Sequence, residues 1–250
     1  MITLASDFGD HYPAAMRGVV HRADTDVVDV THTLPRGDVR AGAFWLAFLL
    51  PEFPPAVHCC VVDPGVGTDR AALVVRAGEH ALVGPDNGLL LPPARALADE
   101  GEVEVFRWRY DDPASATFHG RDVFAPAAVA VDEAGVDGVD GLERAVPAAD
   151  HDPLTLPAPE IGDGGAAGEV LVVDGFGNCI TNVPGTALPA VDTVAVNGQQ
   201  VPVGRSFAAV EPGERLVTVG SHGNLECDVN DGRGEEAFAL APGDAVRFEW

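Results

Sequence analysis

The sequence contains no lysine: all 15 of its basic residues are arginines, against 39 acidic residues and a formal net charge of −24. The absence of lysine excludes enzymes that form a lysine Schiff base, and those that hold nucleotide phosphates with a P-loop or kinase lysine. The scarcity of positive charge argues against nucleic acid as a partner, because phosphate binding needs clustered basic side chains. We interpret the acidity as a surface that stays soluble in strong salt, where self-repulsion is screened, and expect a halophilic protein.

Long apolar runs and paired cysteines are also missing. No stretch of about 18 apolar residues occurs, so the sequence predicts no membrane span. The first residues show no basic segment followed by an apolar one, and we therefore expect a cytoplasmic protein without a membrane partner. The four cysteines form no CxxC pair, and their spacing fits no zinc site. Cys59 and Cys60 lie in an apolar run, which favours buried thiols.

The order of the segments predicts two domains. Over residues 1–150, short apolar segments alternate with segments of helical length, which indicates an α/β domain whose parallel-rich sheet is flanked by helices. Residues 151–168 are rich in Pro, Gly and Asp and are expected to be a linker. Over residues 169–250, short strands recur between turns, which indicates an all-β domain, either a small barrel or a sandwich.

Several individual elements can be predicted from local pattern. MITLAS at the N-terminus and AVHCCVVD before Asp63 are expected to be strands, the second buried on both faces because it is continuously apolar. The segment that starts DVRAGAF has helical periodicity up to Pro51. A second helix, DVFAPAAVAVDEA, is expected to end at Gly135.

The motif SDFGD at residues 6–10 contains the Asp-Phe-Gly triplet with which protein kinases hold magnesium. We do not expect a kinase, because six residues precede Asp7 in this sequence whereas a whole ATP-binding lobe precedes the triplet in kinases. The absence of lysine is a second, independent argument against a kinase.

Polar residues follow several of the predicted strands. In open α/β sheets, ligands bind beyond the carboxyl ends of the strands. The residues expected at this rim are Asp7, Asp10, His32, Asp63, Asp86, Asn87 and His119. Each one alone is as well explained by a helix cap or a turn, so their convergence on one rim is what favours a site.

Two chemistries fit such a rim. The first is a metal-dependent phosphoesterase, with oxygen and imidazole ligands from Asp7, Asp10, His11, His32, Asp63 and His119. The second is metal-free: a carboxylate after the first strand takes two ribose hydroxyls, while Asp63, Arg70 and His119 polarise a water molecule. No HxH, HExxH or DxD pair marks a metal, so we rank the metal site second.

Six motifs occur in order along almost the whole chain: SDFGDHYPAAMRGVV, VVDPGVGTDR, GPDNGLL, TFHGRDVFAP, DGFGNCITNV and GSHGNLECDVN. Together they resemble the S-adenosylmethionine (SAM) hydroxide adenosyltransferase family, which is related to the fluorinase and chlorinase enzymes. The resemblance implies an N-terminal α/β domain, a C-terminal β domain and a homotrimer with sites between subunits. It also implies attack of water or hydroxide on C5′ of SAM to give adenosine and L-methionine, without metal or further cofactor.

The resemblance also implies roles for individual residues. Asp63, Arg70 and His119 match the hydrolytic triad, and Asp7 matches the aspartate that holds the ribose 2′ and 3′ hydroxyls. The remaining residues expected to contact the substrate are Asp10, Phe118, Asp174, Phe176, Asn178, Ser221, Glu226 and Val229. Gly37 departs from the family, whose members usually carry an aromatic residue at this point.

Two rival functions share parts of this pattern. A halogenase of the same fold replaces the acid at the Asp63 position and lacks the histidine at the His119 position; both residues are present here, which favours hydrolysis. A non-catalytic SAM or adenosine sensor would need Asp7 and Asn178 but has no use for the triad.

Overall fold

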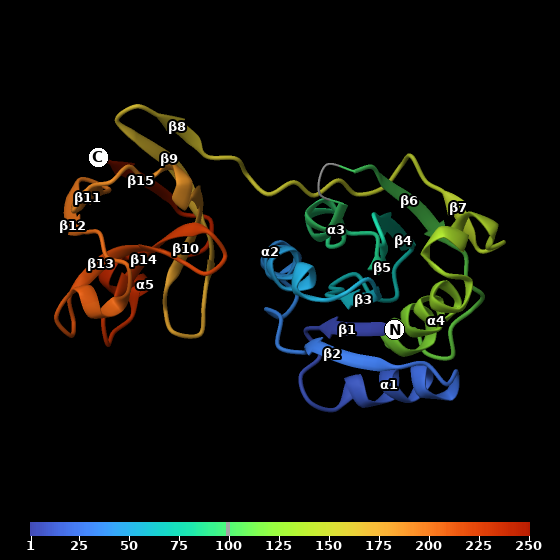
Figure 1. Ribbon diagram of the computed structural model, residues 1–250. Helices are drawn as coiled ribbons and strands as arrows, with labels where there is room; N and C mark the ends of the chain where they lie inside the picture. The colour runs from blue at the N-terminus through green and yellow to red at the C-terminus, as the bar shows by residue number, and fades with distance from the viewer. Residues whose placement is uncertain (99–100) are drawn as a thin grey trace. The chain divides into compact units, whose positions relative to one another are not determined.

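The computed structural model describes residues 1–98 and 101–250 and divides into two compact units, Met1–Thr155 and Leu156–Trp250 (Figure 1). Within the described ranges, no helix is both long and apolar enough to cross a membrane. The segment 151–168, expected as a linker, holds the end of the first unit, strand β8 (Glu160–Gly162) and the start of strand β9 (Gly165–Val173).

A seven-stranded sheet forms the centre of the first unit, in the order β2-β1-β3-β5-β4-β6-β7. Its strands are β1 (Ile2–Ser6), β2 (Val27–Thr31), β3 (Val57–Val61), β4 (Ala72–Ala77), β5 (His80–Pro85), β6 (Val103–Trp108) and β7 (Ala145–Pro147). The sheet is mixed rather than parallel-rich: β2, β1, β3 and β5 run parallel, whereas β4, β6 and β7 pair antiparallel. The change of direction arises because only two residues connect β4 to β5, which allows a hairpin but not a parallel crossover.

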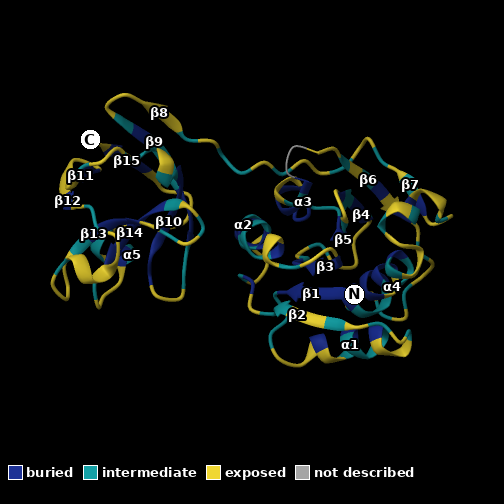
Figure 2. Cartoon of the chain, viewed as in Figure 1, coloured by how far each residue is buried: buried dark blue, intermediate teal, exposed yellow. Residues whose placement is uncertain are grey.

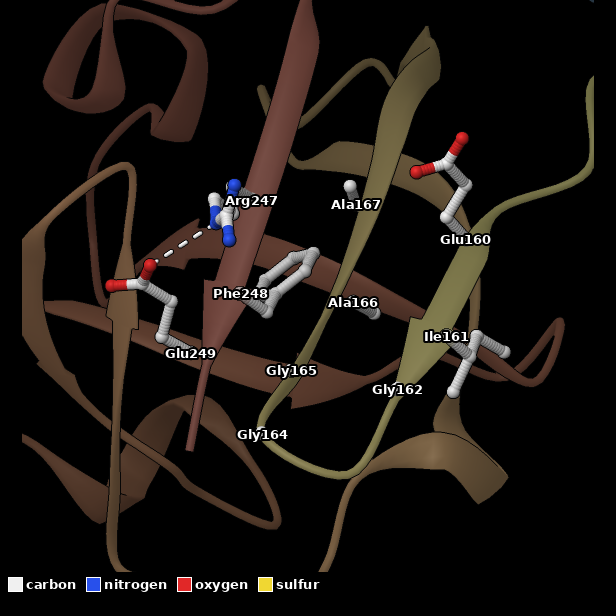
Figure 3. A pocket seen from close by; sticks show the side chains of 10 residues that line it. All are labelled: Glu160, Ile161, Gly162, Gly164, Gly165, Ala166, Ala167, Arg247, Phe248 and Glu249. Carbon is white, nitrogen blue, oxygen red and sulfur yellow. Dashed lines mark hydrogen bonds and ion pairs between the residues drawn. The ribbon is translucent and has the colours of Figure 1, made fainter.

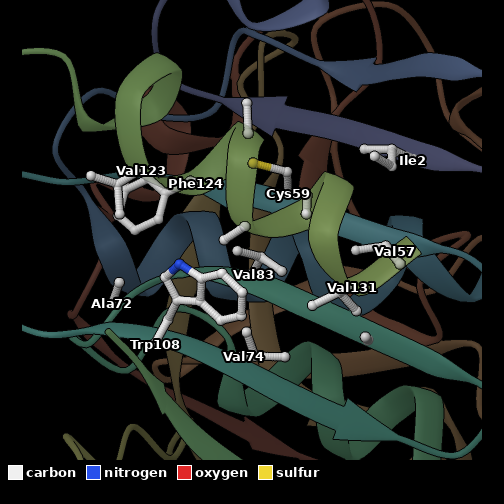
Figure 4. Close-up of a cluster of buried hydrophobic side chains, with 14 of the residues drawn as sticks. Ile2, Val57, Cys59, Ala72, Val74, Val83, Trp108, Val123, Phe124 and Val131 are labelled. Carbon is white, nitrogen blue, oxygen red and sulfur yellow. The ribbon is translucent and has the colours of Figure 1, made fainter. Parts of the chain in front are cut away.

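Helices cover both faces of this sheet. The α-helices are α1 (Tyr12–Arg22), α2 (Val39–Leu49), α3 (Leu91–Ala98) and α4 (Ala125–Ala134); the shorter turns are η1 (Leu50–Glu52), the π-helical η2 (Gly120–Phe124) and η3 (Val136–Gly141). Helices α1 and α4 pack on one face, α2 and α3 on the other. In Figure 4, Phe124 and Val131 lie on either side of Cys59 of β3. Cys60, the next residue, belongs to the opposite core, which confirms that β3 is buried on both faces.

The second unit is built from one antiparallel sheet that nearly closes on itself. The strand order is β12-β11-β15-β9-β10-β14-β13, with β8 paired to β9, and a bridge between Val203 and Val217 joins the two ends of this order. The further elements are β10 (Cys179–Pro184), η4 (Gly185–Ala187), β11 (Thr193–Val196), β12 (Gln199–Pro202), η5 (Phe207–Ala209), β13 (Arg215–Val219), β14 (Asn224–Val229), α5 (Gly234–Phe238) and β15 (Ala245–Glu249). Figure 2 shows buried residues along β10 and β14, in agreement with the complete burial of Cys179, Leu225 and Cys227.

Candidate active site

Two neighbouring parallel strands end side by side at the candidate site. In the register of β1 and β3, Ser6 is opposite Val61, so the residues that follow each strand emerge at the same edge of the sheet. The Asp7 N–H donates to the carbonyl oxygen of Val61 at 3.3 Å, and Asp63 comes two residues after Val61. The predicted convergence at this rim therefore holds for Asp7 and Asp63.

Asp63 and Arg70 form a two-pronged ion pair. Arg70 Nε donates to Asp63 Oδ1 at 2.8 Å, and Arg70 Nη2 donates to Asp63 Oδ2. Both side chains are almost fully buried, at 3% and 10% exposure, which weakens screening by solvent. The turn between them is shaped by Gly67, whose φ is +81° and where an added Cβ would lie 2.8 Å from the Ala116 carbonyl oxygen.

The same guanidinium also reaches His119. Arg70 Nη2 lies 3.0 Å from His119 Nδ1, and because arginine has no acceptor, Nδ1 accepts and carries no proton. Burial, then the Arg70 cation, lower the pKa of His119, so the ring is neutral with its proton on Nε2. Among the described residues, none accepts a hydrogen bond from that nitrogen.

The local backbone explains how His119 is placed. His119 is 4% exposed and stands at the N-terminal boundary of η2, a single π-helical turn, and such turns occur often at functional sites. The ring meets the edge of Tyr110 at 5.9 Å between centroids. Phe124, at the end of η2, receives the Arg70 guanidinium 4.9 Å above its ring. The π-turn thus supplies both a hydrogen-bond partner and an aromatic surface for Arg70.

A cavity of about 640 Å³ opens beside this cluster. Its walls include Arg70 and Tyr110, and its remaining lining residues are Asp69, Ala71, Asp86, Arg107, Trp108 and Arg109. Five of its eight lining residues are charged, and Arg70 borders it from the side of the cluster.

Asp7 is held by one backbone donor. The Gly37 N–H donates to Asp7 Oδ2 at 2.8 Å, and Gly37 has a φ of +68°, a conformation that glycine adopts without strain. His32 Nδ1 lies 2.8 Å from Ser6 Oγ, which accepts from the Phe8 N–H, so His32 braces the loop after β1. Asp7 keeps its Oδ1 available for a ligand, and the backbone N–H of Gly37 orients the carboxylate.

Three aromatic rings gather next to this loop. Phe8, Tyr12 and Phe118 meet edge to face, with centroids 5.3 to 6.3 Å apart, and Arg121 lies 5.1 Å over the Phe118 ring. Tyr12 is 61% exposed. Sequence reasoning singled out Phe118 but not Phe8 or Tyr12, although each of these two stands two residues from Asp10 in the motif SDFGDHYPAAMRGVV.

The other polar residues of the rim serve the fold. Asn87 Nδ2 donates to the Val62 carbonyl and its Oδ1 accepts from the Leu89 N–H, while Asp86 Oδ1 accepts from the Asp152 N–H. Within residues 1–98 and 101–250, no group of three or more His, Cys, Asp or Glu side chains is arranged to hold a metal ion. The predicted metal alternative therefore finds no ligand cluster.

In the second unit, Asp174 organises the turn DGFGN between β9 and β10. Its Oδ1 accepts from the N–H groups of Phe176 and Asn178, both at 2.9 Å, and Asn178 Nδ2 donates to Oδ2 at 3.1 Å. Gly177 adopts a φ of +95°. The result is a braced turn that presents Phe176 with 79% of its surface exposed.

The motif GSHGNLECDVN runs from a turn into β14. Ser221 is exposed in the turn, whereas Glu226 and Val229 are each 7% exposed on the strand. Glu226 Oε1 lies 2.7 Å from His222 Nε2, and Glu226 Oε2 accepts from Thr218 Oγ1 at 3.4 Å. The expected contact residue Glu226 therefore has both oxygens engaged within the unit.

A separate cavity of about 510 Å³ lies along β8, β9 and β15 (Figure 3). Phe248 and the ion pair between Arg247 Nε and Glu249 Oε1, 3.1 Å apart, form one side. None of the site residues predicted from the sequence lines this cavity.

Comparisons with known proteins identify the architecture. Residues 2–138 match the SAM hydroxide adenosyltransferase N-terminal domain, and residues 168–247 match the corresponding C-terminal domain. A protein of Salinispora tropica named (R)-S-adenosyl-L-methionine hydrolase is 44% identical over 98% of this chain and 96% of its own length. A protein of Thermus thermophilus with the same name is 42% identical, covering 97% of each chain.

Solved structures agree with the sequence comparison. An uncharacterized conserved protein from Thermotoga maritima aligns over 100% of both chains with a TM-score of 0.84 and 31% identity. A conserved hypothetical protein from Thermus thermophilus aligns over 99% of this chain and 98% of its own, with a TM-score of 0.78 and 38% identity. With both domains matched and the curated relatives similar over nearly their whole length, this chain belongs to the SAM hydroxide adenosyltransferase family.

Proposed function

We propose that this chain is a SAM hydrolase that uses Asp63, Arg70 and His119 to direct water or hydroxide onto C5′ of SAM, releasing adenosine and L-methionine. The observation that carries the proposal is the buried chain of hydrogen bonds from Asp63 through Arg70 to His119 Nδ1. The relatives named as hydrolases, at 41–44% identity, support the same reaction.

The leaving group of this reaction needs no assistance from the protein to depart. The sulfonium of SAM departs as a neutral thioether, so its departure needs no general acid. The harder task is to hold a poorly nucleophilic water in line with the C5′–S bond. The His119 Nε2–H can donate to the attacking oxygen, and the Arg70 cation favours its hydroxide form, while the proton is released to water.

Asp63 acts on Arg70 in this scheme. Its carboxylate takes two of the guanidinium donors and so fixes the plane from which Nη2 reaches His119. Because His119 Nδ1 accepts the hydrogen bond from Arg70, the neutral ring keeps its proton on Nε2. The triad thus holds a donor at a defined place rather than a strong base.

The remaining residues are proposed to bind the substrate. Asp7 takes the ribose 2′ and 3′ hydroxyls, Asp10 lies in the same loop, and Phe118 lies beside the reacting centre. Asp174 is proposed to face the methionine amine, and the adenosine and methionine contacts are assigned to Phe176, Asn178, Ser221, Glu226 and Val229. No metal and no cofactor besides the substrate enters the proposal.

We also propose a homotrimer, since residues of both units are assigned to one ligand and the family places its sites between subunits. Sedimentation velocity at several protein concentrations, with activity measured across the same range, checks this. We expect activity to follow the trimer peak. A fully active monomer would contradict the assignment.

The direct test is incubation of purified, metal-stripped protein with SAM in strong salt, which suits a net charge of −24. Separate samples of the R and S sulfonium epimers should be used, because the relatives are named for the R form; we expect adenosine and methionine in equal amounts, faster from the R epimer. A 5′-halo nucleoside in place of adenosine would instead support the halogenase. Binding of SAM without formation of products at any salt concentration would favour the non-catalytic sensor.

A further inference from the structure

A row of buried polar side chains lies on one face of strands β13 and β14. Along β14, Glu226 and Asp228 alternate with Leu225 and Cys227, which belong to the apolar core. Thr218 of β13 is opposite Glu226 in the antiparallel register. Asp228 is 0% exposed, and Thr218 and Glu226 are 5% and 7% exposed, so these three groups are shielded from solvent.

These side chains form a continuous hydrogen-bonded chain with the turn before β14. The Asn224 N–H donates to His222 Nδ1 at 3.2 Å, which leaves the ring proton on Nε2 to donate to Glu226 Oε1 at 2.7 Å. Thr218 Oγ1 lies 3.4 Å from Glu226 Oε2 and 2.7 Å from Asp228 Oδ2. A threonine hydroxyl carries a single hydrogen, and here it stands between two carboxyl groups.

If Glu226 and Asp228 are both ionised, this hydrogen-bonded chain of side chains has one hydrogen too few. The single hydroxyl hydrogen of Thr218 can then bond to only one of the two carboxylates, and the other carboxylate faces the lone pairs of the Thr218 oxygen. Asp228 Oδ1 is buried and has no hydrogen-bond partner among the described residues, which is costly for a charged carboxylate and much less so for a neutral acid. A proton on Asp228 Oδ2 resolves both problems: Asp228 donates to Thr218, and Thr218 donates to Glu226.

We propose that Asp228 is a positioning residue that works as a neutral acid: through Thr218 and Glu226 it fixes His222, and with it the turn of residues 220–223 that carries Ser221. The turn packs directly on the chain, since a Cβ added at Gly220 would overlap the Glu226 carboxylate and the His222 ring. The Gly220 N–H to Asn224 carbonyl bond, 2.9 Å, closes it. Asp228 therefore acts on a turn assigned to substrate binding without touching substrate, and this step rests on the proposed function.

The charges around Asp228 agree with this state. Burial raises the pKa of Asp228 to about 7; the hydrogen bond that Thr218 can donate to the ionised carboxylate opposes the shift, and the Glu226 and Asp174 carboxylates add to it. The groups that face it are Glu226 on its own strand, Thr218 from β13 and Asp174 from the turn before β10, whereas the thiols of Cys179 and Cys227 belong to the apolar core on the other face of the sheet. Below about pH 7 the acid is neutral and the chain complete; above it, a second negative charge faces Glu226 and the turn loosens.

The test compares Asp228→Asn with Thr218→Val and with Asp163→Asn, which removes an exposed carboxylate of the same unit. The asparagine amide imitates the protonated acid but cannot ionise. We expect the KM of the parent and of Asp163→Asn to rise several-fold between pH 6 and pH 9, and that of Asp228→Asn to stay flat at the low-pH value of the parent. Thr218→Val should have a raised KM throughout this range with little change in kcat. A pH rise in Asp228→Asn equal to that of the parent would overturn the proposal.

A second measurement needs no substrate. Infrared difference spectra of the free protein at pH 6, parent minus Asp228→Asn, should contain the carbonyl stretch of a protonated carboxylic acid, and the band should vanish by pH 9. Its absence at pH 6 would overturn the neutral-acid assignment even if SAM is hydrolysed. Its presence in a protein that does not hydrolyse SAM would refute the proposed function alone.

Discussion

Replacing Asp63, Arg70 or His119 with alanine is expected to lower kcat for SAM hydrolysis by about 100-fold or more, with KM within a few-fold of the parent. The magnitude follows from the loss of a positioned donor to a developing or attacking anion, which typically costs about 10²–10³ in rate. Each change breaks the same chain, since Arg70 links the Asp63 carboxylate to His119 Nδ1. The triple variant should therefore be little slower than the slowest single variant.

Two further variants sharpen this comparison. Asp112→Ala removes an exposed carboxylate from the loop before His119 and should keep the parent rate. His119→Gln replaces the ring with a group that has both an acceptor and a donor but cannot take up a proton. If His119 serves as a donor, the glutamine variant should be faster than the alanine variant, and if it serves as a base the two should be equally slow. Losses that simply multiply across the three positions would show that the triad does not act as a unit.

The parts of the fold that could be predicted are those with strong local patterns. β1 and β3 are buried at every position and are apolar apart from Thr3, Ser6 and His58. Helices α2 and α4 end where Pro51 and Gly135 indicated, apart from short 3₁₀ and π turns at their margins. Helix α1 was not predicted, because its buried face is only Pro13, Met16 and Val20. Proline in its first turn was the one available signal. Strand β12 has Val201 as its only buried residue and was missed for the same reason.

The residues of the candidate site also differ in whether the sequence alone could predict them. Asp63, Arg70 and His119 could be grouped from motifs, and the structure brings them within hydrogen-bond distance. Thr218 and Asp228 could not be found, because their meeting depends on the register of β13 against β14, which places Thr218 diagonal to Asp228. The brace from Gly37 to Asp7 depends on a backbone N–H, which no side-chain pattern reveals.

Asp7→Ala is expected to weaken binding of adenosyl ligands by at least about 100-fold. A carboxylate that takes two ribose hydroxyls contributes about 1.5–3 kcal/mol per charged hydrogen bond, and about 2.7 kcal/mol corresponds to 100-fold in affinity. The Gly37 N–H occupies only one lone pair of Oδ2, so it orients the carboxylate without consuming it. Calorimetry with SAM in a His119→Ala background separates binding from turnover.

The matched variants decide whether Asp7 binds ligand or only braces its loop. Asp7→Asn retains an oxygen for the Gly37 N–H but loses the charge, so it should fold like the parent and still bind SAM at least about 10-fold more weakly, since a charged hydrogen bond is worth 1.5–3 kcal/mol. Asp26→Asn removes an exposed carboxylate that precedes β2, away from the carboxyl ends of the strands, and should bind SAM as the parent does. If Asp7→Asn and Asp7→Ala both bind SAM normally and differ from the parent only in melting temperature, Asp7 is a brace for residues 6–9, and the ribose must be held by other groups of the rim.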